Sequence, residues 1–85
     1  MPRIEIYTSP LCGYCHAAKR LLTQKGASFT EYDTWADPSA KAEMLRRANG
    51  RRTVPQIFID DHHVGGSDEL HALDRAGGLD PLLKG

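Results

Sequence analysis

The sequence predicts an α/β fold: a four-stranded mixed sheet with helices on both faces, in the order βαβαββα. Two observations predict it. Short β-prone segments alternate with longer segments whose apolar residues recur at helical spacing. Glycine, asparagine or proline stands at most of the boundaries between these segments. The length of 85 residues suits one small domain, so we expect residues 1–85 to form a single domain.

The first part of the chain predicts a strand, a helix and a second strand. Apolar and polar residues alternate over residues 4–7, which is typical of a strand with one face on a core. The helix that follows Cys12 runs to about Lys25 and ends at Gly26. Residues 28–32 are β-prone, and a strand–helix–strand unit can place the two strands in parallel.

The middle of the chain predicts a second helix with clear signals at both ends. Asp37 is expected to cap it, with Pro38 at its first position. Asn49-Gly50 ends it.

The last part predicts a hairpin and a third helix. Residues 54–59 carry the strongest strand signal, and residues 62–64 can return as an antiparallel partner. Ser67 is expected to cap the third helix, and residues 79–83 to pack as a short tail.

Composition excludes some classes of function. Lysine plus arginine equals aspartate plus glutamate at 11 each, so no nucleic-acid or membrane-surface partner is expected. No signal peptide and no segment of membrane-spanning length is visible, so we expect a cytoplasmic protein. In such a reducing compartment a pair of cysteines is usually catalytic or metal-binding.

The two cysteines form the motif Cys12-Gly13-Tyr14-Cys15, where a strand turns into a helix. The free N–H groups and the macrodipole of a helix N-terminus stabilise a thiolate there. A thiolate attacks disulfides, and a second thiol one turn away can displace the first adduct. The motif therefore predicts a thioredoxin-like redox pair.

Three other interpretations of the pair are weaker. Two buried structural thiols are a poor way to fill a core at a helix start. A structural zinc site needs four ligands, and no second pair with suitable spacing exists, so no metal site is expected. His16 completes a C-x-x-C-H pattern for c-type haem attachment, but the pattern is the only support for haem.

Thr53-Val54-Pro55 is the second informative stretch. Pro55 stands at the entrance of a strand, where it would remove a ladder hydrogen bond. A cis bond before it would turn the backbone and leave the Val54 N–H and C=O free to pair with an extended peptide. An ordinary trans proline at a strand start explains the sequence equally well.

Two further stretches can recognise charged groups. Around Gly65-Gly66 and Ser67, exposed N–H groups suit a carboxylate, and Asp68 could pair with an ammonium group. The alternative is an ordinary strand-to-helix turn. Arg51-Arg52 could hold a carboxylate bidentately or could simply be solvated loop charges.

Together these stretches resemble the glutaredoxins over nearly the whole chain, and the ending resembles that of short bacterial dithiol members. The matching segments are residues 4–8, 12–15, 53–55, 65–68 and 77–83. The resemblance implies a thioredoxin fold and glutathione-dependent thiol–disulfide oxidoreductase activity on glutathione mixed disulfides and protein disulfides.

The resemblance also implies a role for each matched residue. Cys12 would be the nucleophile and Cys15 the resolving thiol. The residues expected to bind glutathione are Tyr14, Arg51, Thr53, Val54, Pro55, Gly66, Ser67 and Asp68. The implied partners are glutathione, glutathionylated proteins and disulfide substrates, and the protein is expected to be a monomer when it holds no cluster.

Two residues depart from the pattern of the family. Ser9 replaces a frequent lysine, which removes one positive charge from the neighbourhood of the thiol. Gly13 replaces the usual proline, as in some members that bridge two protomers with a 2Fe-2S cluster. A glutathione-ligated cluster carrier with Cys12 as ligand is therefore the alternative function.

Some features stay without a role. A general thioredoxin-like reductase served by a flavoprotein is disfavoured by the glutathione-site residues. Trp35 is expected to be a loop aromatic, and His62-His63 a solvated hairpin.

Overall fold

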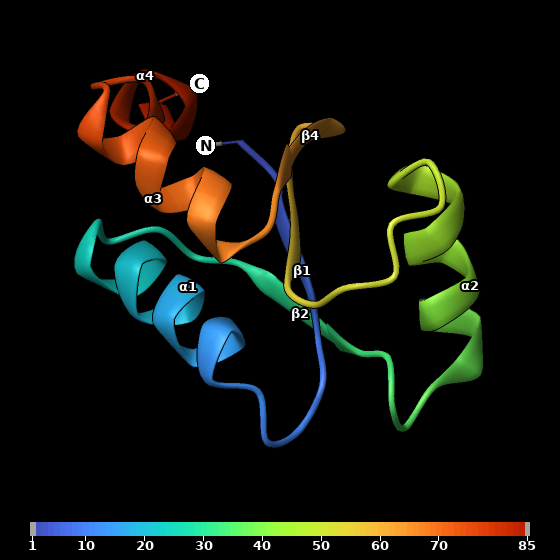
Figure 1. The fold of residues 1–85 in the computed structure, drawn as a ribbon. Coiled ribbons are helices and arrows are strands. Elements are labelled where there is room, and N and C mark those ends of the chain that lie inside the picture. Colours follow the sequence, from blue (N-terminus) through green and yellow to red (C-terminus); the bar gives the residue numbers. More distant parts are fainter. Residues whose placement is uncertain (1, 85) are drawn as a thin grey trace.

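The computed structural model describes residues 2–84 and contains the predicted four-stranded mixed sheet (Figure 1). Its strands are β1 (Ile4–Thr8), β2 (Thr30–Asp33), β3 (Gln56–Ile59) and β4 (His62–Gly65). Its helices are α1 (Gly13–Gln24), α2 (Pro38–Arg47), α3 (Ser67–Arg75) and α4 (Leu79–Lys84). The strand order is β2-β1-β3-β4, with β1 parallel to β2 and the other two pairs antiparallel. The predicted α/β fold class is confirmed.

The sheet separates two apolar layers (Figure 1). Helices α1 and α3 cover one face, and α2 covers the other. The larger layer holds Ile4, Ile6, Ala18, Leu21, Leu22, Ile57, Ile59, Leu70 and Leu79. The smaller layer holds Tyr7, Ala40, Met44, Ala48 and Phe58. Because side chains alternate along a strand, β1 and β3 contribute to both layers.

β1 is more buried than its alternating sequence predicts. The pattern indicates one face on a core, yet all five residues of the strand are buried. β1 lies between β2 and β3 and is covered by helices on both faces, so its polar side chain Glu5 is only 8% exposed.

The predicted ends of α2 are confirmed. The Asp37 carboxylate accepts a hydrogen bond from the Ser39 N–H at 2.9 Å, and Pro38 is the first helical residue. After the helix, Asn49 and Gly50 adopt positive φ of 55° and 87°. This left-handed turn stops the helix.

The first helix and the second strand differ slightly from prediction. α1 ends at Gln24, one residue before the expected Lys25. β2 spans Thr30–Asp33 rather than residues 28–32. Shifts of this size are usual, because helix and strand ends are the least sharply defined parts of an element.

β3 begins two residues later than predicted, at Gln56 rather than Val54. Pro55 has no N–H group to contribute to the ladder, so pairing starts after it. Beyond β3, Asp60 and Asp61 have φ of 49° and 66°, which makes the tight turn into β4.

The C-terminal part shows two corrections. Gly66, not Ser67, is the N-cap residue of α3, and its N–H donates to the Glu69 carboxylate at 2.7 Å. Ser67 is the first helical residue and is buried. Residues 79–83, predicted to be a short tail, belong to α4, which buries Leu79 in the larger layer. Within residues 2–84, no helix has both the length and the apolar character needed to cross a membrane.

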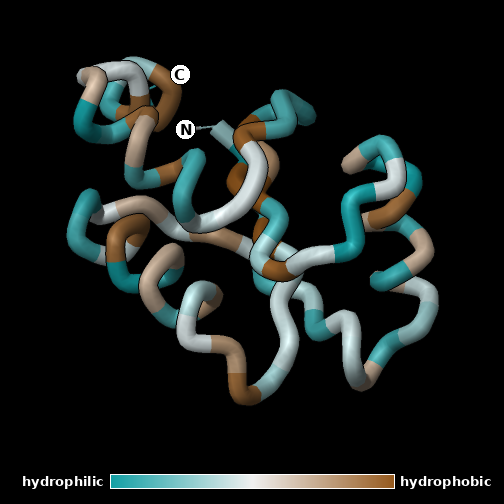
Figure 2. Tube along the Cα trace, in the orientation of Figure 1, coloured by the Kyte–Doolittle hydropathy of each residue, from teal (hydrophilic) through white to brown (hydrophobic). Residues whose placement is uncertain are grey.

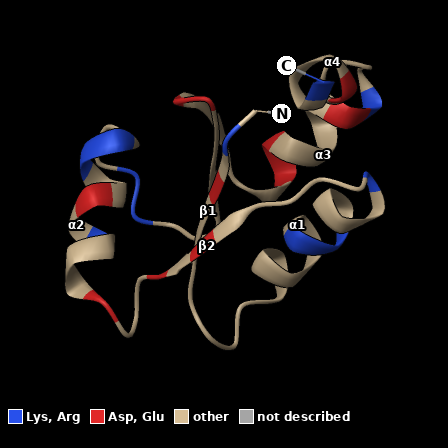
Figure 3. Ribbon diagram, turned by 180° about the vertical axis from the view of Figure 1, so that it is seen from behind, with Lys and Arg blue, Asp and Glu red and all other residues tan. Residues whose placement is uncertain are grey.

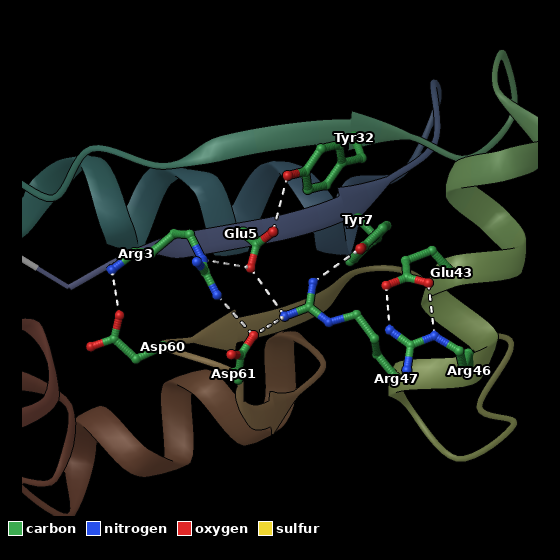
Figure 4. A network of polar contacts seen from close by, with 9 residues as sticks. All are labelled: Arg3, Glu5, Tyr7, Tyr32, Glu43, Arg46, Arg47, Asp60 and Asp61. Atoms are coloured by element: carbon green, nitrogen blue, oxygen red, sulfur yellow. Dashed lines mark hydrogen bonds and ion pairs between the residues drawn. The ribbon is translucent and has the colours of Figure 1, made fainter.

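An ion-pair network ties α2 to the sheet (Figure 4). Arg47 donates hydrogen bonds to Glu5 and to the Tyr7 hydroxyl, both at 3.0 Å. Its guanidinium also lies 4.1 Å from the centre of the Phe58 ring. Burial alone would raise the pKa of Glu5, but hydrogen bonds from Arg47 and Tyr32 outweigh it and lower that pKa. The network therefore keeps a nearly buried carboxylate charged.

Replacing Arg47 with methionine should destabilise the protein by roughly 3 kcal/mol at pH 7, because it leaves the Glu5 carboxylate without its main partner. The lowered pKa of Glu5 means that the pair stabilises the fold above the unfolded-state pKa of this group. That contribution is lost as the pH falls through the folded-state pKa. The difference in free energy of unfolding between the wild type and Arg47→Met, measured by urea unfolding, should therefore become smaller between pH 7 and pH 3.

The matched control is Arg46→Met on the same helix, where the arginine is 70% exposed and pairs with Glu43. This control should leave the free energy of unfolding close to the wild-type value, because exposed ion pairs contribute little to stability. Equal losses for the two variants would contradict the structural role of Arg47.

Candidate active site

The two cysteines lie at the start of α1, as predicted. Cys12 is the N-cap residue, with extended φ and ψ of −118° and 105°. Its Sγ accepts a hydrogen bond from the Cys15 N–H at 3.1 Å. The sulfur thus takes the place of the oxygen in an ordinary cap and receives one of the free N–H groups of the helix.

The environments of the two thiols differ. Cys15 is 1% exposed, and burial, followed by its contact with Cys12, raises the pKa of its thiol to about 12. Cys12 is half-buried, and its Sγ lies 3.8 Å from the Val54 carbonyl oxygen. Only Cys12 is therefore open to attack a disulfide from solvent.

This asymmetry predicts selective alkylation. In the folded, reduced protein at pH 7, iodoacetamide should modify Cys12 at least about 100-fold faster than Cys15, since the thiolate is the reacting species. Peptide mapping by mass spectrometry distinguishes the two sites. In urea both cysteines should react at similar rates; comparable labelling of Cys15 in the folded protein would refute the assignment.

A groove of about 300 Å³ lies beside the cysteine pair. Its lining comes from the start of α1, the loop between α2 and β3, and the start of α3. The lining residues are Tyr14, Arg51, Thr53, Val54, Pro55, Gly66, Ser67, Asp68 and Glu69. The fold therefore brings all eight residues expected to bind glutathione to one place, together with Glu69, which that expectation omits.

The structure shows which isomer the peptide bond before Pro55 adopts, which the sequence leaves open. The Val54–Pro55 peptide bond is cis. The Val54 carbonyl faces Cys12 Sγ, so this loop forms the side of the groove next to the accessible thiol.

Glu69 joins two walls of the groove. Its Oε1 accepts from the Gly66 N–H at 2.7 Å and lies 3.1 Å from the Arg51 guanidinium. The hydrogen bond from Gly66 is the main cause of the lowered pKa of Glu69. A side chain at Gly65, whose φ is +117°, would place Cβ 2.6 Å from this carboxylate. Glycine is therefore required at that position.

These contacts bear on two expectations. The Gly66 N–H is already used inside the protein, so the donors that remain for a carboxylate belong to the following residues of the first turn of α3. Arg51, expected either to hold a carboxylate or to be a solvated loop charge, pairs with the Glu69 carboxylate. The sequence does carry a signal for Glu69, because a glutamate three residues after the N-cap is typical of a capping box.

Replacing Glu69 with alanine should lower the free energy of unfolding by about 1 kcal/mol, the usual value of a helix cap. Glu69→Gln should cost less, since its amide oxygen can still accept from the Gly66 N–H. Chemical denaturation checks both variants. Equal costs would indicate that the ion pair to Arg51, not the cap, is the important contact.

Charged residues give the groove a polarity. Figure 3 shows basic residues at the end of α2 and in the loop after it, and acidic residues at the start of α3. Arg51 and Asp68 belong to these two groups, and both line the groove. A ligand that carries both a carboxylate and an ammonium group would fit this arrangement.

The loops beyond the groove expose apolar side chains. Leu11, directly before Cys12, is fully exposed with φ of 55°. Figure 2 shows a hydrophobic stretch in the loop between β1 and α1. Trp35 is 80% exposed, as expected for a loop aromatic. Asp33 holds its loop by accepting from the N–H groups of Trp35 and Ala36.

The space around Gly13 is open: apart from its chain neighbours and the nearby backbone of α1, no heavy atom lies within 4 Å of a Cβ placed there. Among residues 2–84, no group of three or more His, Cys, Asp or Glu side chains could hold a metal ion.

Comparison with known proteins decides the family. The family model for glutaredoxin matches residues 4–64. The chain belongs to the glutaredoxin family. It is 56% identical over 84 residues to Glutaredoxin 3 of Escherichia coli K12, covering 99% of this chain and 100% of that protein.

Solved glutaredoxins share the fold. The solution structure of the glutaredoxin from Brucella melitensis has a TM-score of 0.85 at 55% identity, covering 99% of this chain and 90% of that one. The crystal structure of a buckwheat glutaredoxin–glutathione complex has a TM-score of 0.87 at 31% identity, covering 98% and 77%. The expected thioredoxin fold is confirmed, and the glutaredoxin function of the chain is that of a thiol–disulfide oxidoreductase.

Proposed function

We propose that this glutaredoxin reduces glutathione mixed disulfides and protein disulfides, with glutathione as the electron donor. The observation that carries the proposal is the position of the groove. It adjoins the one accessible thiol, and it contains a peptide-like edge at Val54 and side chains of both charges, Arg51 and Asp68. The related buckwheat protein was solved in complex with glutathione.

The groove orients the tripeptide. Thr53, Val54 and Pro55 would receive the cysteinyl backbone in an extended form. Asp68, with Ser67 and the free N–H groups of α3, would hold the γ-glutamyl end, and Arg51 would face the glycine carboxylate. Tyr14 and Gly66 would border the tripeptide. Bound in this way, glutathione presents its sulfur to Cys12.

The first half-reaction uses Cys12 alone. Its thiolate attacks the glutathione sulfur of a mixed disulfide, the old S–S bond breaks, and the substrate leaves as a thiolate that takes up a proton. Cys12 now carries glutathione. A second glutathione thiolate attacks the glutathione sulfur of this adduct, which releases glutathione disulfide and restores the Cys12 thiolate.

Protein disulfides need Cys15. After Cys12 has attacked, Cys15 displaces the substrate by attacking Cys12 Sγ, and two glutathione molecules then reduce the Cys12–Cys15 disulfide. The raised pKa of Cys15 means that its proton must leave as it attacks.

Intact mass after brief exposure of the reduced protein to glutathione disulfide tests the proposal. Cys15→Ser should gain one glutathione and should keep the reduction of glutathione mixed disulfides, because the one-thiol route needs only Cys12. Cys12→Ser should gain none. The absence of an adduct on both variants would rule out this mechanism.

A 2Fe-2S cluster carrier is the second candidate. The open space at Gly13, beside the accessible Cys12 thiol, favours it. Cys12 of two protomers and two glutathione molecules would supply the ligands of a homodimer, whereas the unliganded protein would be a monomer. Visible absorbance and labile iron after anaerobic purification would support this function; a colourless monomer would refute it.

The partners and compartment follow from the chemistry. We propose glutathionylated proteins as substrates, because the attacked sulfur belongs to glutathione. We place the protein in the cytoplasm, since the cycle consumes reduced glutathione.

A further inference from the structure

Gln56 is a fully buried polar residue next to the proposed glutathione groove. It is 0% exposed and opens β3 directly after the cis peptide at Pro55. Burying an amide is unfavourable unless its donors and acceptor are all satisfied. The contacts that satisfy Gln56 therefore indicate what this residue holds in place.

The amide joins a loop to a strand. Gln56 Nε2 donates to the Thr53 carbonyl oxygen at 2.9 Å and lies 3.2 Å from the Thr53 hydroxyl. Its Oε1 lies 2.6 Å from His63 Nε2. A carbonyl oxygen can only accept, so the NH₂ group must face Thr53 and Oε1 must face the imidazole. His63 therefore carries a hydrogen on Nε2 and donates it to Gln56.

The imidazole is itself held in place, which corrects the expected solvated hairpin. His63 pairs with Phe58 across the β3–β4 ladder and stacks on its ring, with 4.8 Å between centroids and 20° between planes. Burial, and then the charge of Arg51, lower the pKa of His63. The neighbouring His62 is exposed, as expected.

The chain of contacts ends at the groove. Thr53 lines it, whereas Gln56 and His63 do not. The orientation of the Thr53 carbonyl and hydroxyl thus depends on Gln56, and that of Gln56 depends on His63. A satisfied polar network with a buried amide at its centre favours one conformation of the backbone it contacts.

We propose that Gln56 and His63 are positioning residues. They hold the Thr53–Val54 backbone in the conformation that pairs with the bound tripeptide. This inference rests on the proposed glutathione function and adds residues outside the groove to it. They act on the affinity for the glutathione part of the substrate. The reactivity of the Cys12 thiol does not depend on them.

The test compares Gln56→Leu, His63→Leu and the double variant, which remove the contacts at similar volume. His62→Leu, on the adjacent exposed position, is the matched control. With a glutathionylated peptide as substrate, each single variant should raise KM about fivefold, the usual effect of one hydrogen bond, with kcat within about twofold. The double variant should be no worse than the more affected single variant, because both break one network.

A second readout separates positioning from general damage. The iodoacetamide reaction of Cys12 should keep its wild-type rate in all variants, and so should KM in His62→Leu. A wild-type KM in folded Gln56→Leu and His63→Leu, or a loss in kcat with KM unchanged, would overturn the inference. If Gln56→Leu fails to fold, His63→Leu, which changes only a half-buried side chain, decides.

The proposed function itself is judged on the wild-type protein. Formation of the Cys12–glutathione adduct together with unaltered KM in both variants would remove only the role of Gln56 and His63. Absence of the adduct in the wild type would remove the glutathione function.

Discussion

The rest of the structure depends on the burial of β1 in the middle of the sheet. Its five residues are buried between two neighbouring strands and two helical layers. Because β1 runs parallel to β2 and antiparallel to β3, the loops that follow β1 and precede β3 meet at one edge of the sheet. Those two loops carry Cys12 and Pro55, so the central strand brings the thiol to the groove.

Burial on both faces also has a consequence for charge. The side chain of Glu5 points into the smaller layer, where an apolar residue would be the simpler choice. Arg47 and Tyr32 keep it ionised and hydrogen-bonded, and the guanidinium in turn lies over Phe58. His63 stacks on the same ring, with centroids 4.8 Å apart. The Phe58 ring therefore contacts both Arg47, which pairs with Glu5, and His63, which contacts Gln56 next to the groove.

Different segments of the chain supply the thiols and the walls of the groove. The start of α1 supplies one accessible and one buried thiol, and burial is the main cause of the difference between them. The loop before β3 and the start of α3 supply the walls of the groove, joined by Arg51 and Glu69. In the proposed function, most contacts to the substrate and the sulfur chemistry therefore depend on different parts of the chain, which allows each to be altered separately.

The sequence alone determined the order of the elements from β1 to α3, the ends of α2, the hairpin turn and the place of the cysteine pair. These features depend on residues within one or two turns of each other, such as Asp37 with Pro38. The eight groove residues were expected from family resemblance, and the fold brought them together. The tertiary structure decided the isomer at Pro55, because cis and trans prolines differ by only about 0.5–1 kcal/mol in isolation.

Tertiary structure also decided the long-range polar contacts. Arg47 meets Glu5 across 42 positions, and Glu69 meets Arg51 from another element. The Gln56–His63 contact requires the register of the hairpin. Such contacts depend on which distant side chains share a face of the sheet, and no local pattern of residues specifies that.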